Sequence, residues 1–268
     1  MCKFFRFRDL AYHSFIPYKK LCPEGSRIKK NTGISIIIPV YNENQKLKQA
    51  VDGTMAKLRT LDYVSEIIIA EDGSTDGTYE SASKLASENS NIRLIHSDRR
   101  QGRGQALGRA IKAAKGDVIC YIDVDLATDM SYLPLLIGAV LTEGYDFATG
   151  SRMMPQSDAR RSPKRLIASK SFNWMVRVLL ASRLHDHQCG FKAFRRASVL
   201  QLLDDVKDNH WFWDTEILVR GQIHGYRIKE IPVKWNESDS TKVNILKDAN
   251  EMGRQIIRLW WDLRGNGR

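Results

Sequence analysis

Val118-Ile119-Cys120-Tyr121-Ile122-Asp123-Val124-Asp125 is the stretch of sequence that decides the fold. Its apolar part shows no polar alternation and is typical of a buried strand. Successive side chains of a strand point to opposite faces, so we expect Asp123 and Asp125 on one side of its carboxyl end. Open α/β sheets bind ligands at that end. Two carboxylates there suit Mg²⁺ or Mn²⁺ and, through the metal, a diphosphate; the alternative is a solvated turn.

Upstream of this stretch, short apolar runs alternate with segments of helical periodicity. We expect strands at 34–38, 67–70, 92–95 and 118–122, and helices at 44–60, 79–88 and 105–115. This alternation predicts an α/β fold, a Rossmann-like and mostly parallel sheet that is flanked by helices and joined by right-handed crossovers.

The second half of the chain is less regular. Residues 153–165 are rich in proline and basic side chains, and we expect a mobile basic loop there. Residues 228–235 alternate like a half-buried strand, which Pro232 places at a sheet edge. The remaining expected elements are helices at 131–143, 166–182, 196–204, 214–224 and 245–263 and a strand at 191–194. Because no linker separates the halves, we expect a single domain.

The net charge of +11 is concentrated at the two ends of the chain. Residues 1–33 carry eight Lys or Arg against two Asp or Glu, and residues 252–268 carry four Arg against one Asp. Both ends also contain large apolar side chains, including Trp260 and Trp261. Such a mixture suits an anionic membrane surface. Phosphate contacts to nucleic acid or a solvated arm beside a packed helix are the alternatives.

Several classes of protein are disfavoured. The four cysteines are far apart and form no CxxC pair, which argues against zinc or a disulfide framework and fits a reducing compartment. No apolar run approaches the ~18 residues of a membrane span, and the N-terminus lacks the apolar core of a signal peptide. We therefore expect that the chain does not span a membrane. No helix-turn-helix, RNP or zinc-finger pattern indicates nucleic acid as a partner.

Polar motifs end three of the expected strands. Pro39-Val40-Tyr41-Asn42-Glu43 follows the first, Glu71-Asp72-Gly73-Ser74-Thr75-Asp76-Gly77-Thr78 the second, and Asp123-Val124-Asp125 the fourth. Together, in this order and spacing, they resemble the nucleotide-diphospho-sugar glycosyltransferases of family two, which have the GT-A fold. A sugar-1-phosphate nucleotidyltransferase is disfavoured because no glycine-rich basic loop follows the first strand. A basic binding module with an inactive site is disfavoured by the intact aspartates.

Motifs in the second half narrow this resemblance. They are Gly150-Ser151-Arg152, the segments 186–192 and 212–218, and Val233-Lys234-Trp235. They are similar to the dolichyl-phosphate glucosyltransferases and the related dolichol-phosphate mannose synthases. The resemblance covers residues 33–260. It leaves the N-terminal arm unexplained. We expect a basic aromatic arm at 1–33, a GT-A domain at 34–245 whose second half elaborates the acceptor side, and a C-terminal amphipathic helix at 246–268 that contacts a membrane surface. Because the lipid substrate that the resemblance implies lies in a bilayer, we expect both ends to attach the chain peripherally to the cytoplasmic face of a membrane, without a transmembrane helix.

The resemblance also implies which residues bind the donor. Asp72 would accept a hydrogen bond from the base. The alternative is a structural role, because the same motif is typical of a turn in which the Asp72 side chain caps Ser74 or Thr75. Asp123 would lie near the ribose and the metal, and Asp125 would coordinate Mg²⁺ or Mn²⁺. Mannose synthases carry a glutamine ligand where this chain has Ala127. The other expected donor contacts are Pro39, Tyr41 and Glu43 for the base and ribose and Lys242 for the diphosphate.

On the acceptor side, the resemblance assigns a lipid phosphate to Arg152, Arg165 and Ser169, whereas Arg160 and Arg161 are expected to be solvated. A guanidinium fork matches a phosphate bidentately. The implied activity is inverting transfer of a hexose to a polyprenyl or dolichyl phosphate. The sequence Asp-Leu-Ala-Thr at 125–128 is closer to the glucosyltransferases than to the mannose synthases, which favours UDP-glucose as the donor. The alternatives are GDP-mannose as donor, or transfer to a sugar hydroxyl with Asp214 or Glu216 as the base.

Overall fold

The computed structural model describes residues 33–237 and 245–265. The chain divides into two units, residues 1–30 and 31–268, and only the second contains described residues. The expected N-terminal arm and Lys242 therefore lie outside the described residues, except for Gly33, which begins the first strand.

The first half folds as expected into parallel strands with intervening helices. The strands are β1 (Gly33–Val40), β2 (Val64–Glu71), β3 (Ile92–Ile95) and β4 (Val118–Ile122), and the helices are α1 (Asn44–Leu58), α2 (Thr78–Glu88) and α3 (Arg103–Ala113). β1 lies between β2 and β4 and pairs in parallel with both. These strands are continuous apolar runs because both faces of the sheet are covered and their side chains are buried on either side. The carboxyl ends of β1, β2 and β4 consequently meet at one edge.

The second half extends the same sheet to the order β3-β2-β1-β4-β7-β5-β8. Its strands are β5 (Phe147–Ser151), β7 (Phe191–Arg195) and β8 (Ile228–Pro232), and its helices include α4 (Leu133–Leu141), α6 (Arg196–Leu202) and α7 (Trp213–Ile223). β7 pairs antiparallel with both β4 and β5, and all other pairs are parallel. β8 is an edge strand, which confirms the prediction from Pro232.

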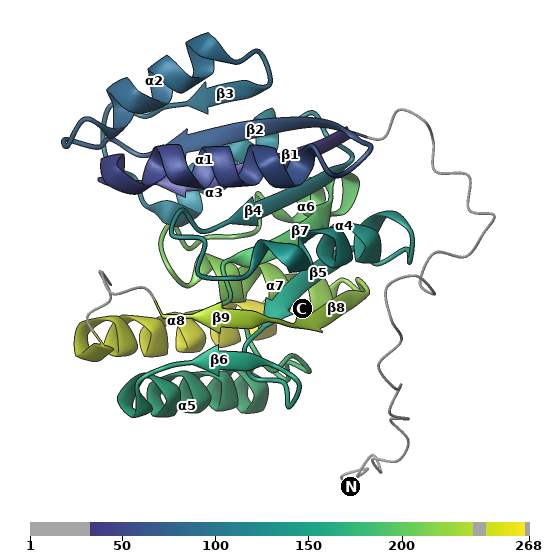
Figure 1. The fold of residues 1–268 in the computed structure, drawn as a ribbon. Coiled ribbons are helices and arrows are strands. Elements are labelled where there is room, and N and C mark those ends of the chain that lie inside the picture. The colour runs from purple at the N-terminus through teal and green to yellow at the C-terminus, as the bar shows by residue number, and fades with distance from the viewer. Residues whose placement is uncertain (1–32, 238–244, 266–268) are drawn as a thin grey trace, which may run out of the picture. The chain divides into compact units, whose positions relative to one another are not determined.

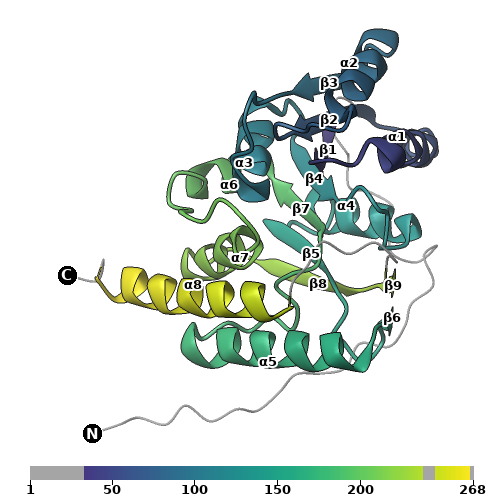
Figure 2. The ribbon, with the colours of Figure 1, turned by 90° about the vertical axis from the view of Figure 1, so that its left-hand side faces the viewer.

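Helices cover both faces of the sheet (Figures 1 and 2). α1, α2 and α4 lie over one face, and α3, α6 and α7 over the other. A further layer consists of α5 (Pro163–Leu179) and α8 (Ile245–Gly265), which lie side by side. They pack on the α7 region through an apolar cluster formed by Val176, Phe212, Val219, Ile256 and Leu259. In the two described segments, no helix is both long and apolar enough to serve as a membrane span.

Two expectations for the second half were wrong. Residues 153–165 are not one loop, because β6 (Asp158–Arg160) lies within them and α5 already begins at Pro163. Proline is well suited to the first position of a helix because its missing N–H has no intrahelical partner there. The expected strand at 228–235 divides at Val233 into β8 and β9 (Lys234–Asn236), and β9 pairs in parallel with β6 in a separate small sheet. Polar strands of this length carry no apolar pattern that would reveal them.

Candidate active site

The loops that follow β1 and β2 are tied together by side chains. The Asn42 backbone N–H donates to Ser74 Oγ at 2.9 Å, and the Glu43 N–H donates to Thr78 Oγ1 at 2.9 Å. In return, the Thr75 N–H donates to Asn42 Oδ1 at 2.8 Å. Asn42 adopts a positive φ of 53°, which asparagine tolerates better than most residues. These contacts fix the relative positions of the two motifs.

The structure brings together the residues expected to bind the base and ribose. Pro39 pairs with Ala70 across β1 and β2, and the Asp72 N–H donates to the Val40 carbonyl at 3.1 Å, so Tyr41 and Asp72 lie at neighbouring strand ends. The Arg100 guanidinium stacks 4.0 Å from the centre of the Tyr41 ring. Glu43 forms an ion pair with Lys46 at 3.5 Å. Binding of a nucleotide by these residues stays a prediction.

Asp72 has a structural task that the sequence did not reveal. Its carboxylate is buried and accepts the backbone N–H groups of Gln101 at 3.1 Å and Gly102 at 2.7 Å, together with Arg109 Nη2 at 3.3 Å. It does not cap the turn, because the Ser74 N–H donates to Glu71 Oε1 instead. A carboxylate can accept about four hydrogen bonds, so one more from a base is compatible with this arrangement.

Asp123 and Asp125 follow β4 in a tight turn. The strand ends at Ile122, and the Leu126 N–H closes the turn on the Asp123 carbonyl at 3.1 Å, so strand alternation does not set their directions. Gly190 provides the space for Asp123, since a Cβ there would lie 1.8 Å from Asp123 Oδ2. Partial desolvation, and then the neighbouring Asp123 carboxylate, raise the pKa of Asp125 above its ordinary value.

This pair of carboxylates fits a divalent cation that is shared with a diphosphate. Mutual repulsion, seen in the raised pKa of Asp125, is what a cation would relieve. Mg²⁺ is commonly held by one or two carboxylates together with substrate phosphates and water. Within residues 33–237 and 245–265, no group of three or more His, Cys, Asp or Glu side chains could hold a metal by itself. The residues therefore suit a metal that binds with the nucleotide.

Arg103 connects Asp123 to Asp214. Its Nη2 donates to Asp123 Oδ1 at 2.7 Å, and its Nη1 donates to Asp214 Oδ2 at 2.6 Å. Lys192 Nζ donates to the other Asp214 oxygen at 2.9 Å and also to Tyr121 Oη at 3.0 Å. We call Arg103, Asp214 and Lys192 the junction. Burial raises the pKa of Asp214 to about 6, although Arg103 opposes the shift, and burial lowers the pKa of Lys192 to about 7.

The junction explains what Asp214 can and cannot do. It is 2% exposed, and both of its oxygens are engaged by cations. Glu216, two residues further along α7, is also fully buried and is paired with Arg220 and with Arg258 of α8. Neither carboxylate is free to remove a proton from an incoming hydroxyl group in this arrangement.

Glycines at the start of α3 make the junction possible. Gly102 has a φ of 113°, and a Cβ on Gly104 would lie 2.7 Å from Trp213 Cβ. Any larger side chain at Gly104 would push the first turn of α3 away from the start of α7. Arg103 would then lose its reach to Asp214. The Gly102-Arg103-Gly104 pattern therefore begins a helix and also allows α3 to pack closely against the start of α7.

Three arginines from the second half of the chain lie close to one another; we call Arg152, Arg161 and Arg165 the arginine cluster. Arg152 forms a bidentate pair with the fully buried Asp186, with Nε to Oδ2 at 2.6 Å and Nη2 to Oδ1 at 2.9 Å. Burial opposes the charge of Arg152, but Asp186 and, more weakly, Asp123 raise its pKa. Arg165 Nη1 donates to Glu237 Oε1 at 2.6 Å.

Trp235 of β9 organises this cluster. The guanidinium of Arg152 lies 5.5 Å, and that of Arg161 5.1 Å, from the centre of its ring. The prediction of a solvated side chain is consistent with the exposed Arg160 but is wrong for Arg161, whose Nε and Nη2 are buried. Ser169 is partly buried on α5, where its carbonyl accepts Asn173 Nδ2 at 2.9 Å. Contact of these residues with a phosphate stays a prediction.

The segment 186–192 supports both groups of charges. Asp186 holds Arg152, and His187 is buried between Ser182 and Asn173, 2.7 Å from each. Burial lowers the pKa of His187 to about 4. Lys192 ends the segment in the junction.

Arg103, Lys192, Arg161 and Trp235 were given no role from the sequence. For Lys192 there was a signal, namely a single cation inside the apolar run Phe191-Lys192-Ala193-Phe194. An ionisable residue in a buried strand requires a partner. Arg161 and Trp235 gave no comparable signal because their contact joins residues far apart in the sequence.

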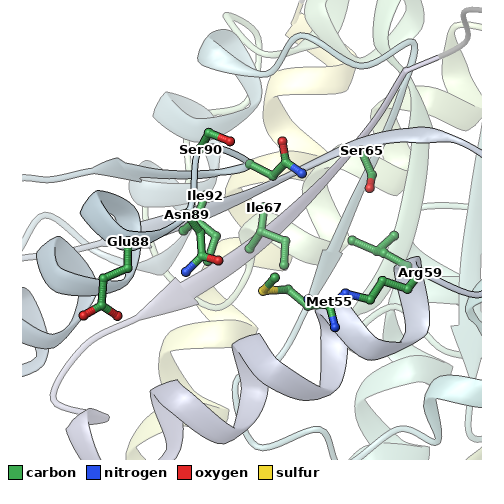
Figure 3. A pocket seen from close by; sticks show the side chains of 10 residues that line it. Met55, Arg59, Ser65, Ile67, Glu88, Asn89, Ser90 and Ile92 are labelled. Carbon is green, nitrogen blue, oxygen red and sulfur yellow. The ribbon is translucent and has the colours of Figure 1, made fainter.

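A hollow at the opposite end of the sheet is separate from this site (Figure 3). Its cavity volume is about 330 Å³, and its lining includes Met55 of α1, Arg59 directly after that helix, Glu88 of α2 and Ser65 near the start of β2. The strand-end carboxylates instead lie at the carboxyl edge, where α/β sheets bind ligands.

Comparison with known proteins agrees with this geometry. The sequence model of glycosyl transferase family 2 matches residues 35–203, and the chain belongs to this family. The chain is 49% identical over 232 residues to the glycosyltransferase AglD of Haloferax volcanii, covering 86% of this chain but only 37% of AglD. It is 31% identical over 235 residues to the dolichyl-phosphate beta-glucosyltransferase ALG5A of Trichomonas vaginalis, covering 84% of this chain and 72% of that protein.

Solved structures confirm the fold. Glucosyl-3-phosphoglycerate synthase from Mycobacterium tuberculosis, in complex with Mn²⁺, UDP and glucosyl-3-phosphoglycerate, matches with a TM-score of 0.65 over 88% of this chain and 81% of that one. At 21% identity, this likeness concerns the fold alone. It confirms the predicted GT-A architecture, and the family match confirms that the chain is a glycosyltransferase.

Proposed function

We propose that this glycosyltransferase transfers glucose from UDP-glucose to dolichyl phosphate or another polyprenyl phosphate, with inversion at the anomeric carbon. The observation that carries the proposal is the division of charge around Asp123. Asp214, the carboxylate that would serve as a base, is locked between Arg103 and Lys192, whereas cations of the arginine cluster gather around Trp235, with Arg152 near Asp123. Dolichyl-phosphate beta-glucosyltransferases among the relatives support the same acceptor.

A phosphate acceptor makes a base unnecessary. A phosphate monoester is already anionic near neutral pH, so its oxygen attacks the anomeric carbon without giving up a proton. The bond from that carbon to the nucleoside diphosphate breaks on the opposite face as the new carbon–oxygen bond forms. Arg152 orients the phosphate and reduces its repulsion by Asp123, while Asp186 fixes the direction of Arg152.

On the donor side, Asp123 and Asp125 would hold Mg²⁺ or Mn²⁺, which acts when bound as a Lewis acid on the leaving diphosphate. Tyr41 and Asp72, which follow the neighbouring strands β1 and β2, would receive the base and ribose. Arg103 keeps Asp123 oriented through its hydrogen bond to Oδ1.

We also propose that α5 and α8 bring this site to a membrane surface. Each helix exposes apolar side chains next to basic ones at helical spacing: Ile167, Lys170, Trp174 and Val178 on α5, and Arg254, Ile257, Trp261 and Arg264 on α8. Trp174 and Trp261 are each 64% exposed. Apolar and cationic side chains on one helix face match the acyl boundary and anionic headgroups of a bilayer.

The membrane contact is tested by flotation with vesicles that contain phosphatidylserine. The double variant Trp174→Ser/Trp261→Ser should float less than the wild type, whereas Val64→Ser, which removes an equally exposed apolar side chain from β2, should float normally. Equal flotation of all three proteins would contradict the proposal. Truncation of α8 is a poorer test because Ile256 and Leu259 are part of the core.

The activity is tested by transfer of labelled sugar into lipid that is extracted by organic solvent. UDP-glucose and GDP-mannose are offered separately with dolichyl phosphate, with Mg²⁺, with Mn²⁺ and with EDTA. We expect metal-dependent labelling of lipid from UDP-glucose. Labelling from GDP-mannose would instead make the chain a mannose synthase, and labelling of a soluble glycan alone would contradict a lipid phosphate acceptor.

A further inference from the structure

We infer that Arg161, and not only the expected Arg152 and Arg165, is a principal binding group for the phosphate of the acceptor. This inference rests on the proposed function and names a further residue of the same site. It starts from an imbalance in the arginine cluster, in which two of the three cations have a carboxylate of their own and the third has none within the part of the chain that the structure describes.

The ion pairs of the cluster show this imbalance. Arg152 is neutralised by Asp186 through a bidentate contact, and Arg165 is paired with Glu237. Arg161 forms no ion pair with a carboxylate among the described residues, and its Nε and Nη2 are buried without a hydrogen-bond partner there. The five side chains together therefore carry one uncompensated positive charge, and it resides on Arg161.

Burial of Arg161 Nε and Nη2 without hydrogen-bond partners costs free energy, which indicates that a bound ligand accepts hydrogen bonds from them. A buried donor without an acceptor loses its hydration and gains nothing in return. Desolvation and then the nearby Arg152 lower the pKa of Arg161 to about 10, so the group remains a cation at neutral pH. Nε and Nη2 are adjacent nitrogens of one planar fork, and this fork can donate to two oxygens of a single phosphate.

The position of Arg161 fits an acceptor that approaches Asp123 from the lipid-facing side. Its guanidinium lies over the Trp235 ring, which also receives Arg152, and Arg152 is close enough to Asp123 to be affected by that charge. Arg161 directly precedes α5, the helix with the exposed Ile167 and Trp174. A phosphate bound between Arg161 and Arg152 would thus join the membrane-facing helix to the metal-binding carboxylates.

The alternative is that Arg161 only stacks on Trp235 and stabilises β9. Arg161→Gln separates the two roles, and Arg160→Gln is a matched control because the neighbouring Arg160 is exposed. If Arg161 binds the phosphate, Arg161→Gln raises the KM for dolichyl phosphate about 10- to 100-fold and leaves the KM for UDP-glucose within about twofold. A stacking role alone would lower the melting temperature and leave both KM values unchanged, and that result would overturn the inference.

A binding measurement keeps this test independent of the proposed activity. Farnesyl phosphate should raise the melting temperature of the wild type and of Arg160→Gln, but not that of Arg161→Gln. Loss of this shift in Arg161→Gln alone would support the inference even if no sugar transfer to lipid were found. An equal shift in all three proteins, or no shift in the wild type, would overturn it. If Arg161→Gln does not fold, Arg161→Lys replaces it; a wild-type KM for dolichyl phosphate in that variant would overturn the role of the guanidinium fork.

Discussion

The two sides of Asp123 differ in charge and in the way their charges are held. On the β1, β2 and β4 side, the strand ends carry carboxylates, and the loops after β1 and β2 are locked to one another by hydrogen bonds from backbone N–H groups to side-chain oxygens. On the β5 and β9 side, the charged groups are the arginine cluster, held by single carboxylates and by the Trp235 ring. This difference suggests how one edge of a sheet could bind two anionic substrates, a nucleotide sugar and a lipid phosphate. In the proposed function, the donor would be bound through a metal held by carboxylates, and the acceptor phosphate directly by cations.

The carboxylate side should show the largest effect on activity. Asp125→Asn removes a proposed metal ligand, and because a bound metal supplies several kcal/mol of charge stabilisation, turnover should fall about 10³-fold. Asp52→Asn, which changes an exposed aspartate paired with Lys48 on α1, should leave turnover unchanged. The measurement is sugar transfer at saturating donor with and without EDTA. If Asp125→Asn kept the turnover of the wild type, the proposed role of a metal bound by Asp125 would be wrong.

The junction between the two sides should respond mainly in stability. Lys192→Met leaves Asp214 buried with one partner fewer, which should lower the free energy of unfolding by about 3–5 kcal/mol. Lys112→Met breaks an exposed pair with Asp204 and should cost less than about 1 kcal/mol. Urea denaturation measures both variants. Equal losses would show that the Lys192–Asp214 pair is not buried in solution.

The support of the arginine cluster should be sensitive to acid. The pKa of His187 is about 4 in the folded protein, against an ordinary value of 6.5. Between these values the unfolded chain binds more protons than the folded one, so the free energy of unfolding should fall as the pH falls, by about 3 kcal/mol in total. His187→Gln should flatten this dependence in the same window. An unchanged pH profile in the variant would contradict a buried neutral histidine.

Smaller effects are expected where α3 approaches α7. A methyl group at Gly104 meets Trp213, so Gly104→Ala should cost about 1–3 kcal/mol of stability and displace Arg103. At Gly108 of the same helix nothing lies within 4 Å of the added methyl, and Gly108→Ala should gain about 1 kcal/mol from helix propensity. Thermal unfolding of the two variants measures whether each substitution lowers or raises the stability. A gain in both variants would mean that α3 does not need this close approach.

The carboxylate side was predictable from the sequence, and the arginine side was only partly so. Continuous apolar runs identify buried strands, and their polar ends identify the ligand edge, which is why β1 to β4 were found. β6 and β9 have no apolar pattern, and the partner of Arg161 lies on another strand of the small sheet. The pairing of Arg103 with Asp214 joins residues more than 100 positions apart, and no local spacing encodes it.

The most direct test of the central claim compares dolichyl phosphate with dolichol, the same lipid ending in a hydroxyl group, as acceptors for labelled UDP-glucose. Because Asp214 is held by Arg103 and Lys192 and the arginine cluster presents cations, we predict label in dolichyl phosphate and none in dolichol. Transfer to dolichol at a comparable rate would contradict the account. It would show that a base operates at this site and that Asp214 leaves the junction during the reaction.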